Sequence, residues 1–352
     1  MNSFSVQITN VDGLTSQQTQ LSQLCGSKQL FRDRYQILGI LGRGGFGITF
    51  LAKNALLPGN PVCVIKQLCP KASNPQSWQR ACDRFEKEAK TLGKLGSHSQ
   101  IPMLLDYFTQ NGEFYLVQEY VRGSTLAQEV RRNGPKNEAG VKKFLQELLP
   151  VLQYLHKHRV IHRDIKPQNL LCCEDDQRVV LIDFGAVKEE LVDACENEIN
   201  KAPATNFVGT MGFAPPEQFS LRPVYASDIY ALGMTCIYLL TGKGPLEFDY
   251  DPNTGEICWQ KQVDISKNFA EVLGKMVKIS LAERFKTADD VIKALDQEKY
   301  LPNLSNCLAT QKLKNKSISQ EENQQVYVPP VARTASAIRA WKARLKETKS
   351  SS

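Results

Sequence analysis

Side chains able to bind a metal ion and to move a proton gather in two short stretches of this sequence. The first, from Val160 to Leu171, reads V-I-H-R-D-I-K-P-Q-N-L-L, and D-F-G begins at Asp183, after a short apolar strand over 178–182. Carboxylate and carboxamide oxygens are ligands that suit Mg²⁺, and a carboxylate can also accept a proton. An isolated H-R-D is more often a group of solvated loop residues. His, Arg, Asp, Lys and Asn followed by D-F-G, in this order, indicate a chemical site.

The spacing H-R-D-x-x-x-x-N followed by D-F-G resembles the catalytic loop and the metal loop of the protein kinases. Phosphoryl transfer from ATP has a loose transition state, so such an enzyme works by positioning the reactants and stabilising charge. The resemblance implies that Asp164 orients the proton of the attacking hydroxyl and that Asn169 and Asp183 hold Mg²⁺ (or Mn²⁺). Lys166 is the family's mark of serine/threonine rather than tyrosine specificity and would steady the transferred phosphate.

A glycine-rich segment follows an apolar strand that starts near Tyr35. Its spacing, G-x-G-x-x-G, is by itself a weak signal, because dinucleotide-binding folds share it. A dinucleotide site would continue into a helix, whereas residues 48–52 continue as a strand, as in the kinase glycine-rich loop. The resemblance places the ATP phosphates against Gly42, Arg43, Gly44, Gly45, Phe46 and Gly47.

The next strand ends in Lys66, at the place of the family's ATP-anchoring lysine. Val64 replaces the usual alanine and would narrow the roof of the adenine pocket. A helix follows, and its Glu88 matches the glutamate that would pair with Lys66 and aim the ammonium at the phosphates. Glu86 is the competing partner, but the register F-x-x-E-A favours Glu88.

Two further strands complete a small β-rich lobe and lead to a hinge. Gln118 occupies the gatekeeper position at the back of the adenine pocket. The resemblance implies that backbone groups of Glu119 and Val121 bond the adenine edge, and that Leu171 also contacts the nucleotide.

A second segment of the family pattern, G-T-M-G-F-A-P-P-E, occupies residues 209–217. It resembles the substrate-docking segment of the kinases, except that Pro215 replaces the usual alanine. The resemblance implies that the Thr210 hydroxyl bonds Asp164 and Lys166, which is again serine/threonine chemistry. A small-molecule kinase on a related fold would be expected to lack this segment.

The same resemblance implies two buried side-chain contacts in the second half of the chain. Glu217 would pair with Arg284, and Asp228 would hold the backbone of the catalytic loop. The helix before that loop has one apolar face but contains Pro150, which removes a hydrogen-bond donor and clashes one turn back. We therefore expect this helix to bend.

The polar segment after D-F-G resembles the activation loop. Between Gly185 and Gly209 its one hydroxyl-bearing residue is Thr205, so a phosphorylation switch in this loop would use Thr205, with the Arg163 guanidinium as partner. The alternative is that Arg163 packs the loop without any phosphate. Cys195 in the same loop could be oxidised, although ten cysteines without metal-ligand spacing favour reduced structural thiols.

Composition and charge limit the classes of protein to which this chain could belong. The chain has 352 residues, of which 42% are hydrophobic, enough for a buried core. The longest apolar run, 229–240, contains Gly233 and suits a buried helix, and the N-terminus lacks signal-peptide features, so we expect a cytoplasmic protein. The net charge of +7 resides in the segment from Lys299 onward, which has ten Lys or Arg and three Glu. This charge says nothing about nucleic-acid binding by the folded part, and no nucleic acid is expected among the partners.

These features predict an α+β, bilobal protein kinase fold. A small β-rich N-lobe with one main helix would span 35–122, and a larger helical C-lobe 123–297. Residues 1–34, rich in Gln, Ser and Thr, are expected to form a flexible polar leader, and 298–352 a basic, largely disordered tail. A short amphipathic helix over 335–346 would dock on an acidic membrane surface, on a partner or on the kinase, or would be only a frayed helix.

The resemblance covers residues 35–297, with every catalytic position of the family occupied. Details such as A-P-P-E-Q are most similar to the eukaryotic-like (Hanks-type) serine/threonine kinases of bacteria, cyanobacteria in particular. We predict an ATP-dependent kinase that phosphorylates Ser and Thr of protein substrates, and itself, in bacterial signalling. The alternative is a pseudokinase, which loss of Lys66, Asp164 or Asp183 would have indicated, and none is lost. The substrate, the activating signal and the oligomeric state stay open.

Overall fold

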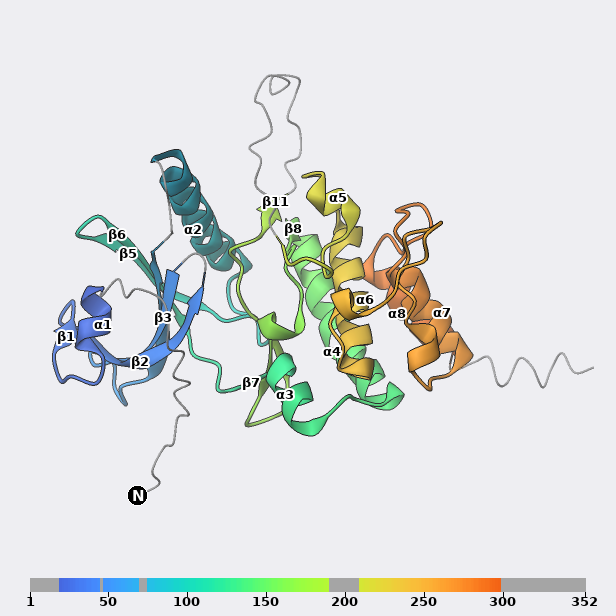
Figure 1. Cartoon of the computed structure of the whole chain (residues 1–352). Coiled ribbons are helices and arrows are strands. Elements are labelled where there is room, and N and C mark those ends of the chain that lie inside the picture. The colour runs from blue at the N-terminus through green and yellow to red at the C-terminus, as the bar shows by residue number, and fades with distance from the viewer. Residues whose placement is uncertain (1–18, 45–46, 70–74, 190–208, 299–352) are drawn as a thin grey trace, which may run out of the picture. The chain divides into compact units, whose positions relative to one another are not determined.

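The computed structural model describes residues 19–44, 47–69, 75–189 and 209–298, which belong to one compact unit (Figure 1). The predictions for Gly45, Phe46, Cys195, Thr205 and the basic tail concern residues outside the described ranges.

The first part of the described chain contains a six-stranded antiparallel sheet (Figure 1). Its strands are β1 (Leu30–Phe31), β2 (Tyr35–Gly44), β3 (Gly47–Asn54), β4 (Val62–Leu68), β5 (Leu104–Gln110) and β6 (Glu113–Glu119), in the order β1-β2-β3-β4-β6-β5. The helix α2 (Pro75–Leu95) packs on one face, where its Phe85 and Leu92 share a core with Leu116. Successive residues of a strand point to opposite faces, so Tyr115 and Val117 face away from α2.

The opposite face of the sheet has a core of its own, and this corrects the prediction of a flexible leader. Residues 19–34 contain the helix α1 (Gln20–Leu24), which Thr19 caps, and the strand β1, which pairs with β2. Leu21 and Phe31 are 0% and 1% exposed and pack with Tyr115 in this second core. The prediction was wrong here because apolar side chains within a polar stretch pack against strands that lie far along the chain.

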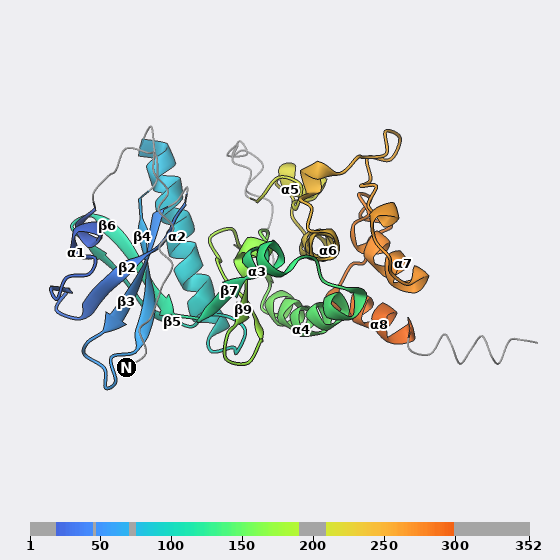
Figure 2. The same ribbon diagram turned by 60° about the horizontal axis from the view of Figure 1, so that its bottom comes forward.

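Helices dominate the rest of the described chain (Figure 2). They are α3 (Leu126–Asn133), α4 (Glu138–Lys157), α5 (Pro216–Phe219), α6 (Tyr225–Thr241), α7 (Lys267–Met276) and α8 (Ala288–Glu298), with single 3₁₀ turns η1 (Pro167–Asn169), η2 (Pro245–Glu247) and η3 (Gln260–Gln262). The helix α6 is buried along nearly its whole length. The helix α4 continues from Glu138 to Lys157 through Pro150, so the proline does not end it.

Short strands frame the predicted catalytic loop. The strand β8 (Val160–Ile161) precedes the loop and pairs with β11 (Lys188–Glu189), while β9 (Leu170–Cys173) follows it and lies between β7 (Gly123–Thr125) and β10 (Val179–Leu181). The arrangement confirms the predicted α+β fold, with a β-rich part that has one main helix and a larger helical part. None of the helices in the described ranges is sufficiently long and apolar to span a membrane.

Candidate active site

The backbone of the catalytic loop is held by Asp228, which lies in the first turn of α6 and is fully buried. Its carboxylate accepts the N–H groups of His162 and Arg163, both at 2.9 Å, and lies 3.0 Å from His156 Nε2. Burial alone would raise the pKa of Asp228, but the hydrogen bond and charge of His156 and the Arg163 N–H lower it. An ionised carboxylate therefore orients the start of the loop.

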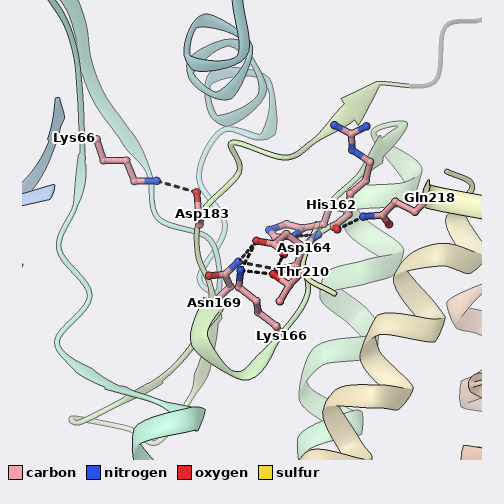
Figure 3. A network of polar contacts seen from close by, with 9 residues as sticks. Lys66, His162, Asp164, Lys166, Asn169, Asp183, Thr210 and Gln218 are labelled. Carbon is pink, nitrogen blue, oxygen red and sulfur yellow. Dashed lines mark hydrogen bonds and ion pairs between the residues drawn. The ribbon is translucent and has the colours of Figure 1, made fainter. Parts of the chain in front are cut away.

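Asp164 is the centre of a network of side chains (Figure 3). Lys166 Nζ donates to Asp164 Oδ2 and to Thr210 Oγ1, both at 2.7 Å, and Thr210 Oγ1 donates to Asp164 Oδ1 at 2.8 Å. Asn169 Nδ2 donates to Asp164 Oδ2 and to the Asp164 backbone oxygen, both at 2.9 Å. Both carboxylate oxygens are thus fixed in place, as the orientation of an incoming hydroxyl requires.

Asn169 and Asp183 are the residues predicted to hold a metal ion. Asn169 bonds Asp164 through Nδ2, so its Oδ1 is the atom that could ligate a metal. Asp183 has a φ of 67°, which is uncommon for residues other than glycine, and its side chain is half exposed. The Lys66 ammonium lowers the pKa of Asp183, which favours the ionised carboxylate. Both residues line one cavity, and their oxygens fit Mg²⁺.

Lys66 on β4 forms an ion pair with Glu88 on α2. Lys66 Nζ lies 2.6 Å from Glu88 Oε1 and 3.5 Å from Asp183 Oδ1. Burial alone would lower the pKa of Lys66, but the charges of Glu88 and Asp183 raise it, so the ammonium persists. Glu86, the competing candidate, instead bonds Lys90 at the surface of the helix.

Most of these side chains line one cavity of about 490 Å³. Of the predicted site residues, the cavity is lined by Gly44, Gly47, Lys66, Glu88, Asp164, Lys166, Asn169, Asp183 and Thr210, together with Gln118. It extends along α2 to Ala81, Arg84 and Phe85.

Several residues predicted to contact the nucleotide do not line this cavity. They are Gly42, Arg43, Val64, Glu119, Val121 and Leu171. Val64 is buried within the central strand β4, and the Glu119 N–H already donates to Met103 O at 2.9 Å. A contact of these six residues with nucleotide therefore stays a prediction.

Comparisons with known proteins agree with this geometry. A family model described as "Protein kinase domain" matches residues 35–301. The chain belongs to the protein kinase family. Within that family it is similar to serine/threonine kinases of bacteria, cyanobacterial ones in particular.

The relatives include "Serine/threonine-protein kinase B" of Synechocystis sp., which is 53% identical over 283 residues, or 80% of this chain and 49% of that protein. "Serine/threonine-protein kinase PknA" of Nostoc sp. is 46% identical over 271 residues, or 76% of this chain and 48% of that protein. The chain thus spans about half of the length of these curated relatives.

The docking segment of the kinase is anchored by a buried ion pair. Arg284, whose side chain is 0% exposed, donates to the two carboxylate oxygens of Glu217 at 2.6 and 3.3 Å. Its guanidinium also donates to three backbone oxygens, those of Ala226, Lys278 and Ile279. Such a bidentate, fully bonded arrangement fixes the end of the docking segment against the helices.

Gln218 and Arg84 are polar residues of the site that were not predicted from the sequence. Gln218 donates to Arg163 O at 2.6 Å. Arg84 lines the cavity one helical turn before Glu88, and burial together with the Arg84 charge lowers the pKa of Arg163 to about 10. The i, i+4 spacing of Arg84 and Glu88 on the expected helix could have indicated Arg84, whereas no spacing indicated Gln218.

Proposed function

We propose that the chain is an active serine/threonine protein kinase that transfers the γ-phosphate of ATP to hydroxyl groups of proteins. The observation that supports this most is the network of Asp164, Lys166, Asn169 and Thr210. An active arrangement also requires the ion pair of lysine and glutamate next to the metal-binding aspartate, and Lys66 makes that contact with Glu88.

Each side chain has a place in the transfer step. Asp164 would orient the acceptor hydroxyl and accept its proton, and Lys166 would steady the transferred phosphoryl group. Lys66 would contact the phosphates of ATP. Asn169 and Asp183 would hold Mg²⁺ or Mn²⁺, which neutralises phosphate charge.

We further propose a role in bacterial signalling, with protein substrates, autophosphorylation and a cytoplasmic location. The names of the relatives, which are serine/threonine-protein kinases, support the substrate class. The contact of Thr210 with Asp164 and Lys166 supports the choice of Ser and Thr. Docking by the basic tail on a membrane surface or a partner, and the lack of nucleic-acid binding, stay predictions.

Phosphorylation of Thr205 is proposed as the switch of this kinase. The Arg163 guanidinium donates through Nε to Ala186 O, which is how it packs the loop without phosphate. Arg84 adds a second positive charge close to it. A phosphate on Thr205 would relieve the repulsion between the two guanidinium groups and form charge-assisted hydrogen bonds with them.

The test is phosphoryl transfer by the purified chain with Mg²⁺ and labelled ATP, with and without a general acceptor protein. We expect transfer that Asp164→Ala abolishes, and mass spectrometry should locate phosphate on Thr205. Nucleotide binding without transfer, across metals and acceptors, would instead favour a pseudokinase. Transfer with no phosphate on Thr205 would support the proposed kinase activity but contradict the proposed phosphorylation switch.

A further inference from the structure

Gln218 contacts the peptide bond that leads into Asp164 (Figure 3). Its Nε2 donates to Arg163 O at 2.6 Å, across 55 residues of chain. The residue is 2% exposed and belongs to α5, directly after the docking segment. We propose that Gln218 is a positioning residue for phosphoryl transfer, which clamps the Arg163–Asp164 peptide and so sets the orientation of Asp164. The proposal rests on the kinase activity proposed above.

The backbone of Arg163 needs such a clamp because its φ is 68°, a conformation that residues with a Cβ seldom adopt. Its N–H donates to Asp228 Oδ1 at 2.9 Å, and its Nε donates to Ala186 O. These contacts hold the N–H and the side chain. The carbonyl, which belongs to the peptide bond before Asp164, is held by Gln218.

The two ends of that peptide are bonded unequally. The Asp164 N–H donates to His162 Nδ1 at 3.4 Å, whereas the Arg163 carbonyl accepts from Gln218 at 2.6 Å. The shorter bond is the stronger restraint on rotation of the peptide plane. Rotation of this plane would swing the Asp164 side chain, so Gln218 controls the direction of the carboxylate.

The docking segment and the residue that follows it therefore hold Asp164 at two points. Thr210, near its start, donates to the carboxylate at 2.8 Å, and Gln218, beyond its end, bonds the peptide. The neighbour of Gln218, Glu217, is itself fixed by Arg284 at 2.6 Å and by Ser227 Oγ at 2.8 Å. Correct folding of the docking segment is thereby coupled to the geometry of the catalytic carboxylate.

Three variants of the full chain test the clamp in phosphoryl transfer. Gln218→Met keeps the length of the side chain but removes the donor, and should lower kcat by about tenfold or more, with the KM for ATP within about twofold. Gln218→Lys offers a donor nitrogen again and should recover part of kcat. Gln153→Met is the matched control, since Gln153 Nε2 donates to Asp289 at 2.7 Å, between α4 and α8, and should leave kcat unchanged.

Hydrogen exchange without nucleotide provides a readout that does not need activity. In Gln218→Met, peptides covering 160–171 should exchange faster, while α6 should stay as protected as in the wild type. If the wild type transfers no phosphate, the proposed activity fails, and exchange still decides the clamp. The proposal would be overturned by a wild-type kcat in Gln218→Met or by no recovery of kcat in Gln218→Lys. It would also be overturned if hydrogen exchange in Gln218→Met were unchanged over 160–171 or faster throughout α6.

Discussion

The carboxylate of Glu88, on α2, receives a 2.6 Å bond from the ammonium of Lys66, on the central strand β4, and its side chain is only 5% exposed. The same ammonium contacts Asp183 at 3.5 Å. One positive charge thus joins the sheet, the helix that covers it and the loop that would hold the metal. Displacement of α2 would break this link, so the position of the helix decides where the ammonium points.

Replacing Glu88 by Gln tests the contact between Lys66 and Glu88 with almost no change in the shape of the side chain. The variant loses a charge-assisted hydrogen bond worth about 1.5–3 kcal/mol, so kcat/KM for ATP should fall by about 10- to 100-fold in steady-state assays. Glu86→Gln is the control on the same helix, because Glu86 pairs with Lys90 at exposed positions and the change should stay within about twofold. Similar kinetics for the two variants would contradict the role of Glu88.

Asp228 should contribute a pH-dependent part of the stability. Its pKa in the folded protein lies below the ordinary value, so the contribution is full above the unfolded pKa of about 4 and is lost as the pH falls through the folded pKa. Asp228→Asn leaves buried backbone N–H groups facing an amide and should lower the free energy of unfolding by about 3 kcal/mol near neutral pH. In urea unfolding, the difference in free energy of unfolding between the wild type and Asp228→Asn should be smaller in acid than near neutral pH. An equal difference at both pH values would refute this account.

The catalytic residues could be predicted because their spacing is local. Asp164, Lys166 and Asn169 lie within six residues, and each type suits a separate part of phosphoryl transfer. The contact of Gln218 with Arg163 could not be predicted, because it joins residues 55 positions apart and any buried glutamine could have made it. The extension of the cavity along α2 also depends on packing between distant elements.

The packing of α1 and β1 likewise could not be predicted from the sequence. Leu21 and Leu24 have helical spacing over only one short turn, and Phe31 lies on a separate strand after a mostly polar stretch, so no single period links the three. Their partners, Tyr115 and Phe50 among them, lie on strands further along the chain. The N-terminal stretch is polar on average, yet these side chains close the second face of the sheet.

Replacing Phe31 by Ala tests whether this second core stabilises the kinase. The ring is 1% exposed, with centroids 5.0 Å from Tyr115 and 6.1 Å from Phe108, so we expect a loss of about 3–5 kcal/mol in the free energy of unfolding. Leu56→Ala, at a hairpin position that is 66% exposed, should change it by less than about 0.5 kcal/mol. Equal denaturation midpoints for the two variants would restore the view of a flexible leader.

Replacing Gly47 by Ala tests the close approach of the glycine-rich hairpin to β4. A Cβ at this position would lie 2.0 Å from Gln67 O and 3.2 Å from Cys69 N, and backbone atoms cannot move aside as a flexible side chain can. The substitution must shift β3, and with it Gly44, which pairs with Gly47 at the rim of the cavity. Overpacking of this kind costs about 1–3 kcal/mol, so the Kd for an ATP analogue should rise by about tenfold.

Gly39→Ala is the matched control for this experiment. Gly39 lies on β2 of the same hairpin, and a Cβ there would meet no atom within 4 Å. Nucleotide binding should stay at the wild-type level, and thermal melting of both variants shows whether either has unfolded. If both variants bind the analogue equally well, the approach of Gly47 to Gln67 does not position the phosphate-binding backbone, and the affinity for nucleotide must come from the Lys66 side of the cavity.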